Sequence, residues 1–145
     1  MRATLFDSHH EGKVMKVKIT LELDEQFLKD VLTTICESGN YGINYWATPG
    51  RVVEGTPTDY TAVQIAYDRE EGSEGDRKGR IKMNLKRVAE GIQRVLTTSP
   101  KELYLHESYI GRIAAAVAAN DAGQIDGELA DWIAQAAIFK KMVYS

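Results

Sequence analysis

The chain has 145 residues, of which 43% are hydrophobic and 27% charged, as is usual for one globular domain with its own core. Its formal net charge of -3 excludes a protein that binds nucleic acid through overall positive charge. A single cysteine, Cys36, excludes an intrachain disulfide and fits a reducing compartment. Because neither a signal peptide nor a membrane-length apolar run is visible, we expect a cytoplasmic protein that does not enter a membrane.

The N-terminal part of the chain predicts an extension, a strand and a helix. Residues 1–14 show no hydrophobic period, so we expect a flexible extension followed by a single domain over 15–145. Apolar and polar side chains alternate over 14–23, which predicts a half-buried strand. Asp24 is a favourable N-cap, and the apolar stripe that follows it predicts a helix over 25–37.

The middle of the chain predicts a sheet. We expect the sheet to resume at 44–46 and a turn at 49–50, where proline and glycine are adjacent. Residues 68–80 are almost wholly charged residues and glycine, which predicts a mobile hairpin loop. The expected strands are 51–53, 60–67 and 81–83.

The second half of the chain predicts three further helices. Asn84 is a suitable cap for the first of them, whose apolar face continues to Leu96. The run Ser-Pro-Lys-Glu at 99–102 matches a capping box and predicts a helix over 100–119. Asp126 can cap the last helix, after which 142–144 can close the fold as a short strand.

This order of elements predicts the fold class. A strand and a helix, then several strands, then three helices indicate an α+β single domain. We expect a small antiparallel sheet of about three or four strands, packed by about four helices.

The sequence offers no motif that names a reaction. His9 and His10 are adjacent but have no third ligand at the spacing of a metal site. Cys36 lies on an apolar stripe without a neighbouring base that would activate it. The glycine-rich run 72–79 lacks the Gly-Lys-Ser/Thr of a phosphate loop, and 120–126 lacks the ligand pattern of a calcium loop. We therefore predict no catalytic residue, no metal and no cofactor.

Basic residues are concentrated in residues 77–101, where eight lysines and arginines face a single acid, Glu90. Arg87 and Arg94 are seven residues apart on the second predicted helix and therefore share a face. This segment can form a surface for phosphates, a nucleotide or an acidic protein. The simpler interpretation is a solvated face balanced by the acidic residues just upstream, and we favour it.

The run Asn44-Tyr45-Trp46 is the other candidate site. On a strand, Tyr45 and Trp46 would point to opposite faces, so at most one of them would lie in the core. The other would be exposed or would contact a partner, since tyrosine and tryptophan combine apolar area with a polar group. Core packing and a binding role are equally compatible with this pattern.

The two ends of the domain resemble a family of small proteins encoded by phages and prophages. The family tends to show Leu-x-Thr-Ala, Glu-Gly-Gly and Asn-Tyr-Trp, and this chain has similar residues over 32–46. The family's C-terminus, with Ala-Asp, Leu-Gln, Phe-Gly-Glu and a final Tyr-Gly, is similar to residues 130–145. Here Lys140-Lys141 replaces Gly-Glu, Ser145 replaces the last glycine, and 40–43 resembles an insertion.

No activity is attached to that family, so the resemblance carries over no catalytic residue. It implies a viral accessory gene that acts on a host system. The shared surface that the resemblance implies comprises Glu37, Asn44, Tyr45, Trp46, Asp131 and Gln135. The polar residues of this set can equally form a structural hydrogen-bond network.

Three functional hypotheses follow. The favoured one is a non-enzymatic binding protein that inhibits or sequesters a host factor in the host cytoplasm, as an anti-CRISPR protein or by capture of a nucleotide signal. Its partner would be a host protein or a small nucleotide-like ligand. The alternative is a small nucleic-acid-binding accessory protein of phage replication or transcription, acting through 77–101. The third is an enzyme that uses scattered residues such as His106, Asp121 and Asp131.

A homo-oligomer is compatible with all three hypotheses. An exposed strand edge or the tyrosine-containing C-terminus could form the contact between copies.

Overall fold

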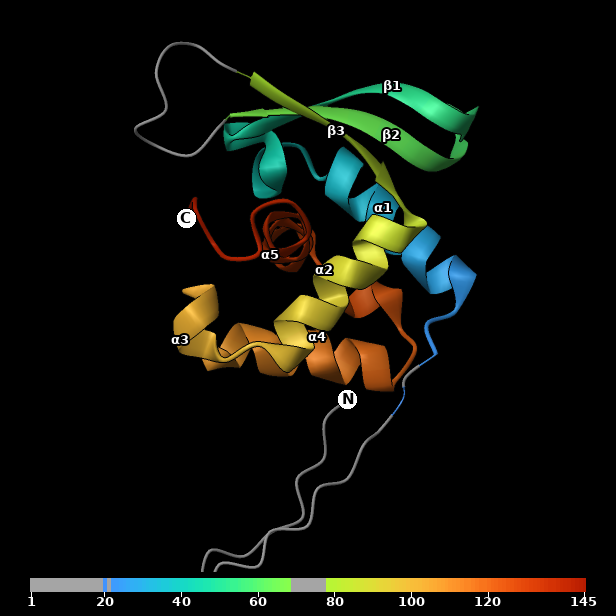
Figure 1. Ribbon diagram of the computed structural model, residues 1–145. Coiled ribbons are helices and arrows are strands. Elements are labelled where there is room, and N and C mark those ends of the chain that lie inside the picture. Colours follow the sequence, from blue (N-terminus) through green and yellow to red (C-terminus); the bar gives the residue numbers. More distant parts are fainter. Residues whose placement is uncertain (1–19, 21, 69–77) are drawn as a thin grey trace, which may run out of the picture.

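The computed structural model describes residues 20, 22–68 and 78–145, and the arrangement of their elements is shown in Figure 1. The expected extension at 1–14 lies outside the described residues. So does nearly all of the expected strand at 14–23, of which residues 20, 22 and 23 are described and are not in a strand.

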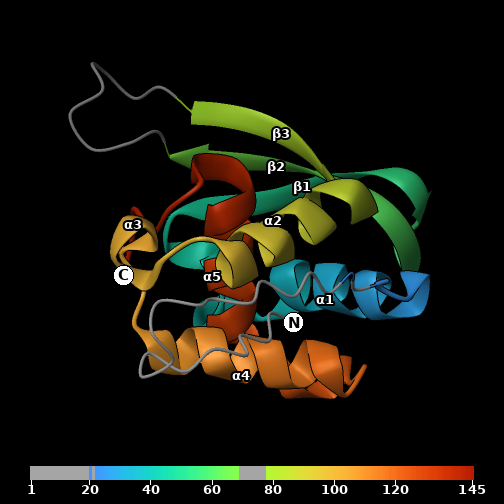
Figure 2. The ribbon, with the colours of Figure 1, turned by 60° about the horizontal axis from the view of Figure 1, so that its bottom comes forward.

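The described residues form a three-stranded antiparallel sheet with helices packed on one side of it, as Figures 1 and 2 show. The strand order is β1-β2-β3, so each strand follows its neighbour in sequence. The expected α+β fold with a small antiparallel sheet is therefore confirmed. The strands are β1 (Ala47–Thr56), β2 (Asp59–Asp68) and β3 (Lys78–Asn84).

The strands are longer than the sequence pattern predicts. The expected turn at 49–50 is wrong, because both residues lie inside β1, where the register shifts between Pro49 and Val52. An edge strand tolerates proline because one of its two rows of backbone groups needs no ladder partner. The expected loop over 68–80 is shorter than predicted, since Asp68 ends β2 and 78–80 begin β3. Its middle, 69–77, lies outside the described residues.

The expectation that the sheet resumes at 44–46 is also wrong. Two short 3-10 helices, η1 (Gly39–Tyr41) and η2 (Ile43–Tyr45), follow the first helix, and β1 begins only at Ala47. The side chains of Tyr45 and Trp46 therefore project from a tight turn and not from the two faces of a strand.

Side-chain caps fix the starts of most helices. Asp24, Asn84, Ser99 and Asp126 each accept a hydrogen bond from a backbone N–H in the first turn, as expected. The helices are α1 (Glu25–Glu37), α2 (Leu85–Thr97), α3 (Pro100–Leu103), α4 (Glu107–Ala118) and α5 (Gly127–Phe139), with a further 3-10 helix η3 (Ala122–Gln124).

The single helix expected over 100–119 is in fact two helices. Tyr104 adopts the left-handed conformation, with φ 55°, and ends α3 after one turn. His106 then caps α4 by accepting a hydrogen bond from the Ser108 N–H. Because of this break, the side chains of Leu103 and Leu105 are both buried in the core, although they are only two residues apart. Helical spacing would have turned one of them to solvent.

α5 is the central helix of the core. Nine of its 13 residues are buried, and Figure 1 shows it end-on beneath the sheet, with α2 and α1 beside it. α2 lies against it at Gly91, where an added Cβ would come within 2.5 Å of the Ile133 carbonyl oxygen. None of the helices in the described ranges combines the length and apolar character that crossing a bilayer demands.

The short strand expected at 142–144 is absent from the described structure. These residues are in neither a helix nor a strand. Their backbone groups instead bond to a side chain of α5, as described below.

Candidate functional site

Tyr45, Trp46 and Asp131 form a hydrogen-bonded cluster between the η2 turn and α5. The Asp131 carboxylate is buried, with 3% of the residue exposed. The Tyr45 hydroxyl donates to its Oδ2 at 2.5 Å, and the Trp46 indole Nε1–H donates to its Oδ1 at 2.7 Å. Two adjacent residues of the turn therefore hold the two oxygens of one buried acid.

Gln135, one helical turn beyond Asp131, extends the cluster to the C-terminal residues. Its Nε2 donates to Asp131 Oδ1 at 2.9 Å and to the Tyr144 carbonyl oxygen at 3.0 Å. Its Oε1 accepts from the backbone N–H groups of Val143 and Tyr144, both at 2.8 Å. A longer contact of 3.4 Å joins Nε2 to the Tyr45 hydroxyl. Gln135 is fully buried, and all of its hydrogen-bonding groups are used.

Aromatic rings pack against the indole of Trp46 and extend the cluster. The Tyr144 ring stacks on Trp46, with ring centroids 5.8 Å apart and an interplanar angle of 3°. Phe139 packs against Trp46 at 5.5 Å and against Tyr67 of β2, also at 5.5 Å. These contacts leave Trp46 only 1% exposed, so of the Tyr45–Trp46 pair it is Trp46 that belongs to the core.

Burial is the main influence on the acidity of the cluster. Desolvation raises the pKa of Asp131, while the hydrogen bonds from Tyr45, Gln135 and Trp46 oppose that rise. Burial also raises the pKa of Tyr45, and its donation to Asp131 raises that pKa further because the neutral phenol is the donor. The Tyr45 phenol therefore stays protonated at neutral pH, as donation to Asp131 requires.

This geometry suits positioning better than catalysis. Three donors already converge on the two Asp131 oxygens. A general base needs a free lone pair within reach of a substrate proton. The cluster therefore holds the η2 turn, α5 and the C-terminal residues in one fixed arrangement.

The outward side of the same turn is a surface of exposed polar and aromatic groups. Tyr41 is 86% exposed, Tyr45 is 50% exposed, and Asn44 between them is also exposed. The turn lies close on the start of α5, because a Cβ added at Gly127 would stand 2.6 Å from the Tyr41 carbonyl oxygen. We call Tyr41, Asn44 and Tyr45 the aromatic turn surface.

The two arginines predicted as a binding pair have different surroundings. Arg94 Nη1 donates to the carbonyl oxygens of Ala136 and Ala137 at 3.0 and 2.9 Å. It thereby pairs with the negative end of α5, where unpaired carbonyls favour a cation. Arg87 is half-buried near the start of α2, where its backbone N–H donates to the Asn84 side chain. The structure does not bring either arginine into the Asp131 cluster.

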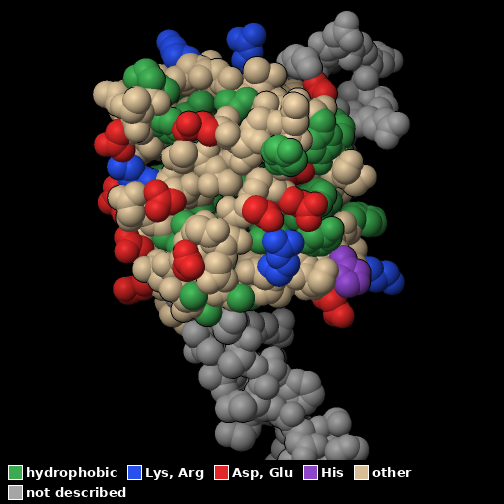
Figure 3. All heavy atoms as spheres, turned by 180° about the vertical axis from the view of Figure 1, so that it is seen from behind, with side chains coloured by type: hydrophobic (Ala, Val, Ile, Leu, Met, Phe, Trp, Pro, Cys, Tyr) green, Lys and Arg blue, Asp and Glu red, His purple; other side chains and the backbone are tan. Residues whose placement is uncertain are grey.

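Other basic residues of the 77–101 segment are exposed on β3 and early α2. Arg80, Lys82 and Lys86 are exposed, and Lys82 lies 3.8 Å from Glu54 of β1. On the face seen in Figure 3, acidic side chains are spread widely, and basic ones stand at the upper rim, at one side edge and on both sides of the histidine. The basic side chains visible on that face form no continuous patch.

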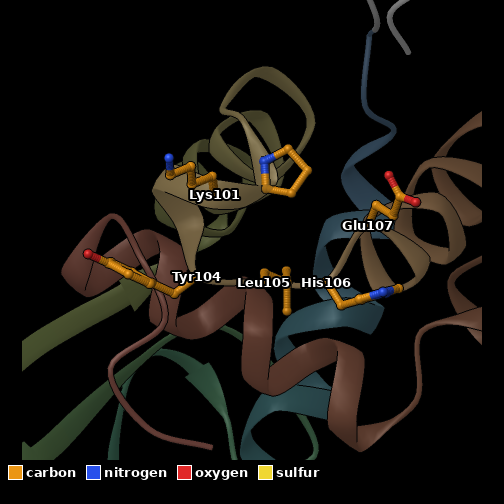
Figure 4. Close-up of a pocket in the computed structure, with 6 residues that line it drawn as sticks. Lys101, Tyr104, Leu105, His106 and Glu107 are labelled. Carbon is orange, nitrogen blue, oxygen red and sulfur yellow. The ribbon is translucent and has the colours of Figure 1, made fainter.

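A shallow hollow of about 500 Å³ lies where α3 meets α4, away from the Asp131 cluster. Figure 4 shows Tyr104 pointing away from His106 and Glu107, so these polar groups do not converge on one point. The lining residues are Pro100, Lys101, Tyr104, Leu105, His106 and Glu107.

The residues of the enzyme hypothesis lie apart. His106 precedes α4 and Asp121 follows it, so a helix of 12 residues, about 18 Å long, separates them. Asp131 is buried in α5. Burial raises the pKa of the Cys36 thiol to about 12, which disfavours the reactive thiolate. Among the described residues, no three His, Cys, Asp or Glu side chains group closely enough to hold a metal ion.

Glu37, part of the surface implied by the family resemblance, lies elsewhere. Its Oε2 accepts from the Tyr60 hydroxyl at 2.6 Å, which links α1 to β2. Sequence reasoning did not anticipate this pair, nor the stacking of Tyr144 on Trp46. Neither could be found from spacing, because each joins residues distant along the chain. Tyr41 could have been noted, since it follows a glycine and an asparagine in a turn-forming run.

Comparison with known proteins gave no relative: no family model, no curated protein and no solved structure matches the chain.

Proposed function

We propose that the chain is a phage- or prophage-encoded accessory protein that binds and inhibits a host protein, without catalysis. Anti-defence activity, such as inhibition of CRISPR machinery, is the concrete form of this proposal. The observation that carries it is the aromatic turn surface, where a half-exposed Tyr45 is held by its hydroxyl to buried Asp131.

Such an arrangement favours binding for a physical reason. An exposed tyrosine offers a large apolar area and few rotatable bonds, so fixing it against a partner costs little conformational entropy. Tyr45 has already lost most of that freedom, because Asp131 holds its far end at 2.5 Å. Tyr41 and Asn44 add a second ring and an amide beside it. A rigid aromatic anchor with polar neighbours is typical of protein–protein interfaces.

A host protein fits this surface better than a nucleotide signal does. The two exposed rings belong to a turn, and neither lines the pocket at the α3–α4 junction. Small ligands are usually bound in clefts that enclose most of their surface. The hollow at the α3–α4 junction is shallow, and its polar residues do not converge.

The test is a binding and protection experiment with matched variants. The double variant Tyr41→Ala/Asn44→Ala removes exposed groups that lie outside the Asp131 cluster, so the fold should be retained. Tyr104→Ala is the control, because Tyr104 is 72% exposed on a different turn. Native mass spectrometry of each protein purified from host lysate would reveal a retained host protein. A phage plaque assay would measure protection from host defence.

We expect the wild type and Tyr104→Ala to retain one host protein at fixed stoichiometry and to protect the phage. The double variant should lose both properties while its unfolding transition stays unchanged. If the double variant binds and protects like the wild type, the aromatic turn surface is not the contact.

A nucleic-acid-binding accessory protein is the second candidate. The observation in its favour is the exposed basic group Arg80, Lys82 and Lys86 at the junction of β3 and α2. Binding through these residues must weaken steeply with salt because phosphate contacts release counterions. The variant Arg80→Gln/Lys82→Gln/Lys86→Gln should reduce the salt slope by about three. A salt-independent shift, or no binding of DNA or RNA at low salt, would remove this candidate.

A further inference from the structure

An acidic side chain lies beside the aromatic turn surface. Glu128 is exposed on the first turn of α5. It follows Gly127, where an added Cβ would stand 2.6 Å from the Tyr41 carbonyl oxygen. Glu128 makes no ion pair with any residue in the described ranges. An exposed carboxylate therefore borders the surface of Tyr41, Asn44 and Tyr45.

A second negative charge lies behind this surface. Asp131 comes three residues after Glu128, so the two acids share a side of α5. The Asp131 carboxylate accepts hydrogen bonds from Tyr45, Trp46 and Gln135, and all three donors are neutral. Burial is the main reason why the pKa values of Tyr45 and Asp131 are raised, and the negative charge of Glu128 raises both further. The electrostatic potential around the Tyr45 ring is therefore negative.

The other exposed tyrosine shows which group such a ring attracts. The Lys141 ammonium lies 6.0 Å from the centroid of the Tyr104 ring. Within the part of the chain that the structure describes, no lysine or arginine lies over Tyr41 or Tyr45 in this way. The face of an aromatic ring is negative and attracts cations, and a nearby carboxylate strengthens that attraction. The aromatic turn surface therefore has the groups that bind a cation, and the described residues supply none to it.

We propose that Tyr41, Tyr45 and Glu128 together bind an arginine side chain of the partner protein. This inference rests on the proposed function and specifies the chemistry of the partner. A guanidinium group is flat, so it stacks on a tyrosine ring and donates two parallel hydrogen bonds to a carboxylate, which the ammonium of lysine cannot do. A phosphate backbone or an acidic peptide would be repelled by Glu128.

A titration of the full chain with N-acetylarginine amide tests this site without the host protein. N-acetylcitrulline amide is the control ligand, because it has nearly the same shape and no charge. In NMR spectra, the arginine compound should shift the ring signals of Tyr41 and Tyr45 saturably, by at least about three times as much as the citrulline compound does. Added salt should weaken the binding. Equal shifts from both compounds, or no shift at these rings, would overturn the proposal.

The variant Glu128→Gln tests the carboxylate, because it removes the charge and keeps the size of the side chain. It should lower the affinity for N-acetylarginine amide by about two- to fivefold. Glu107→Gln is the matched control, since Glu107 is an exposed acid on the first turn of α4 and both variants lose a similar interaction with a helix N-terminus. The control should bind like the wild type. Wild-type affinity in Glu128→Gln would overturn the proposed site.

The same two variants separate this inference from the proposed function in host lysate. Glu128→Gln should release the host protein at a lower salt concentration than the wild type and Glu107→Gln do. If Glu128→Gln retains it like the wild type while Tyr41→Ala/Asn44→Ala loses it, the proposed function stands and the arginine contact is wrong. If all of these variants retain the host protein like the wild type, the proposed function is contradicted as well.

Discussion

Two turns of this molecule present an exposed tyrosine, and they are built differently. Tyr45 is 50% exposed, but its hydroxyl is bonded to a buried carboxylate. Tyr104 is 72% exposed and has a left-handed backbone, and its ring contacts the Lys141 ammonium, 6.0 Å from the ring centroid. One ring is fixed from inside the fold, whereas the other rests on a surface contact.

The difference separates an ordered surface from a merely exposed one. A surface cation–ring contact is worth about 0.5–1 kcal/mol and leaves the ring much of its freedom. A charge-assisted hydrogen bond to a buried acid is worth about 1.5–3 kcal/mol and fixes the end of the ring. Exposure alone would rank Tyr104 above Tyr45 as a binding residue. Anchoring reverses that order.

Removing Asp131 should damage the Tyr45 turn most. Asp131→Ala leaves the Trp46 indole N–H buried without its acceptor and should destabilise the fold by about 3–5 kcal/mol. Asp131→Asn keeps one acceptor oxygen and can donate to the Tyr45 hydroxyl, so it should stay within about 1 kcal/mol of wild type. Urea unfolding measures both. A loss within about 1 kcal/mol for Asp131→Ala as well would show that the network contributes little.

Removing Gln135 should have the next largest effect. Gln135→Leu deprives Val143 and Tyr144 of their shared acceptor and should cost about 2–3 kcal/mol. Gln124→Leu is the matched control, since Gln124 is exposed and its side chain donates to Asp121, three residues earlier in the chain. Amide NMR signals of 143–144 should broaden or shift in the first variant alone. If both variants unfold at the same urea concentration as wild type, Gln135 does not hold residues 143–144 in place.

The buried carboxyl also predicts a pH dependence. Because burial raises the pKa of Asp131, the native state holds its proton more tightly than the unfolded state does. Its contribution to stability is therefore complete below the unfolded pKa of about 3.9, and it falls as pH rises toward the native pKa. Asp131→Asn cannot titrate there. Wild type should therefore lose stability relative to Asp131→Asn, measured as the unfolding free energy, as pH rises above about 4.

The smallest effects compare the two tyrosine hydroxyls directly. Tyr45→Phe removes the donor to Asp131 and should cost about 1–2 kcal/mol. Tyr104→Phe removes an exposed hydroxyl that has no hydrogen bond to any of the described residues, and should stay within about 0.5 kcal/mol. Thermal or urea unfolding of the pair checks this contrast. Equal stability of the two variants would mean that the hydroxyl of Tyr45 does not anchor its turn.

Local signals in the sequence predicted much of the fold. The caps at Asp24, Asn84 and Asp126 set the starts of α1, α2 and α5 correctly, because capping depends on residues within one turn. The alternation at 60–67 located β2 for the same reason. The break at Tyr104 could not be predicted in this way. It is decided by the burial of Leu103 and Leu105, which depends on the rest of the core.

The sequence grouped part of the cluster but not its geometry. Of the six residues that the family resemblance grouped, Tyr45, Trp46, Asp131 and Gln135 lie together in the structure, whereas Glu37 and Asn44 lie outside the cluster. The sequence could not show that η2 directs Tyr45 and Trp46 to one acid, because a strand would have separated them. Asn44 belongs to the same turn but has no place in the cluster. Its role in binding stays a prediction.

The burial of α5 on nearly all sides has a consequence for motion. Its central amides, from Leu129 to Ala137, are covered by α1, α2 and the sheet, so no small opening exposes them to water. Their hydrogen exchange should require unfolding of the whole domain. The residues of η1 and η2 other than Ile43 are exposed, so their N–H groups should exchange through smaller, local openings. The candidate contact thus lies directly on the slowest-exchanging helix, where binding of a partner would slow exchange in η1 and η2 but not in α5.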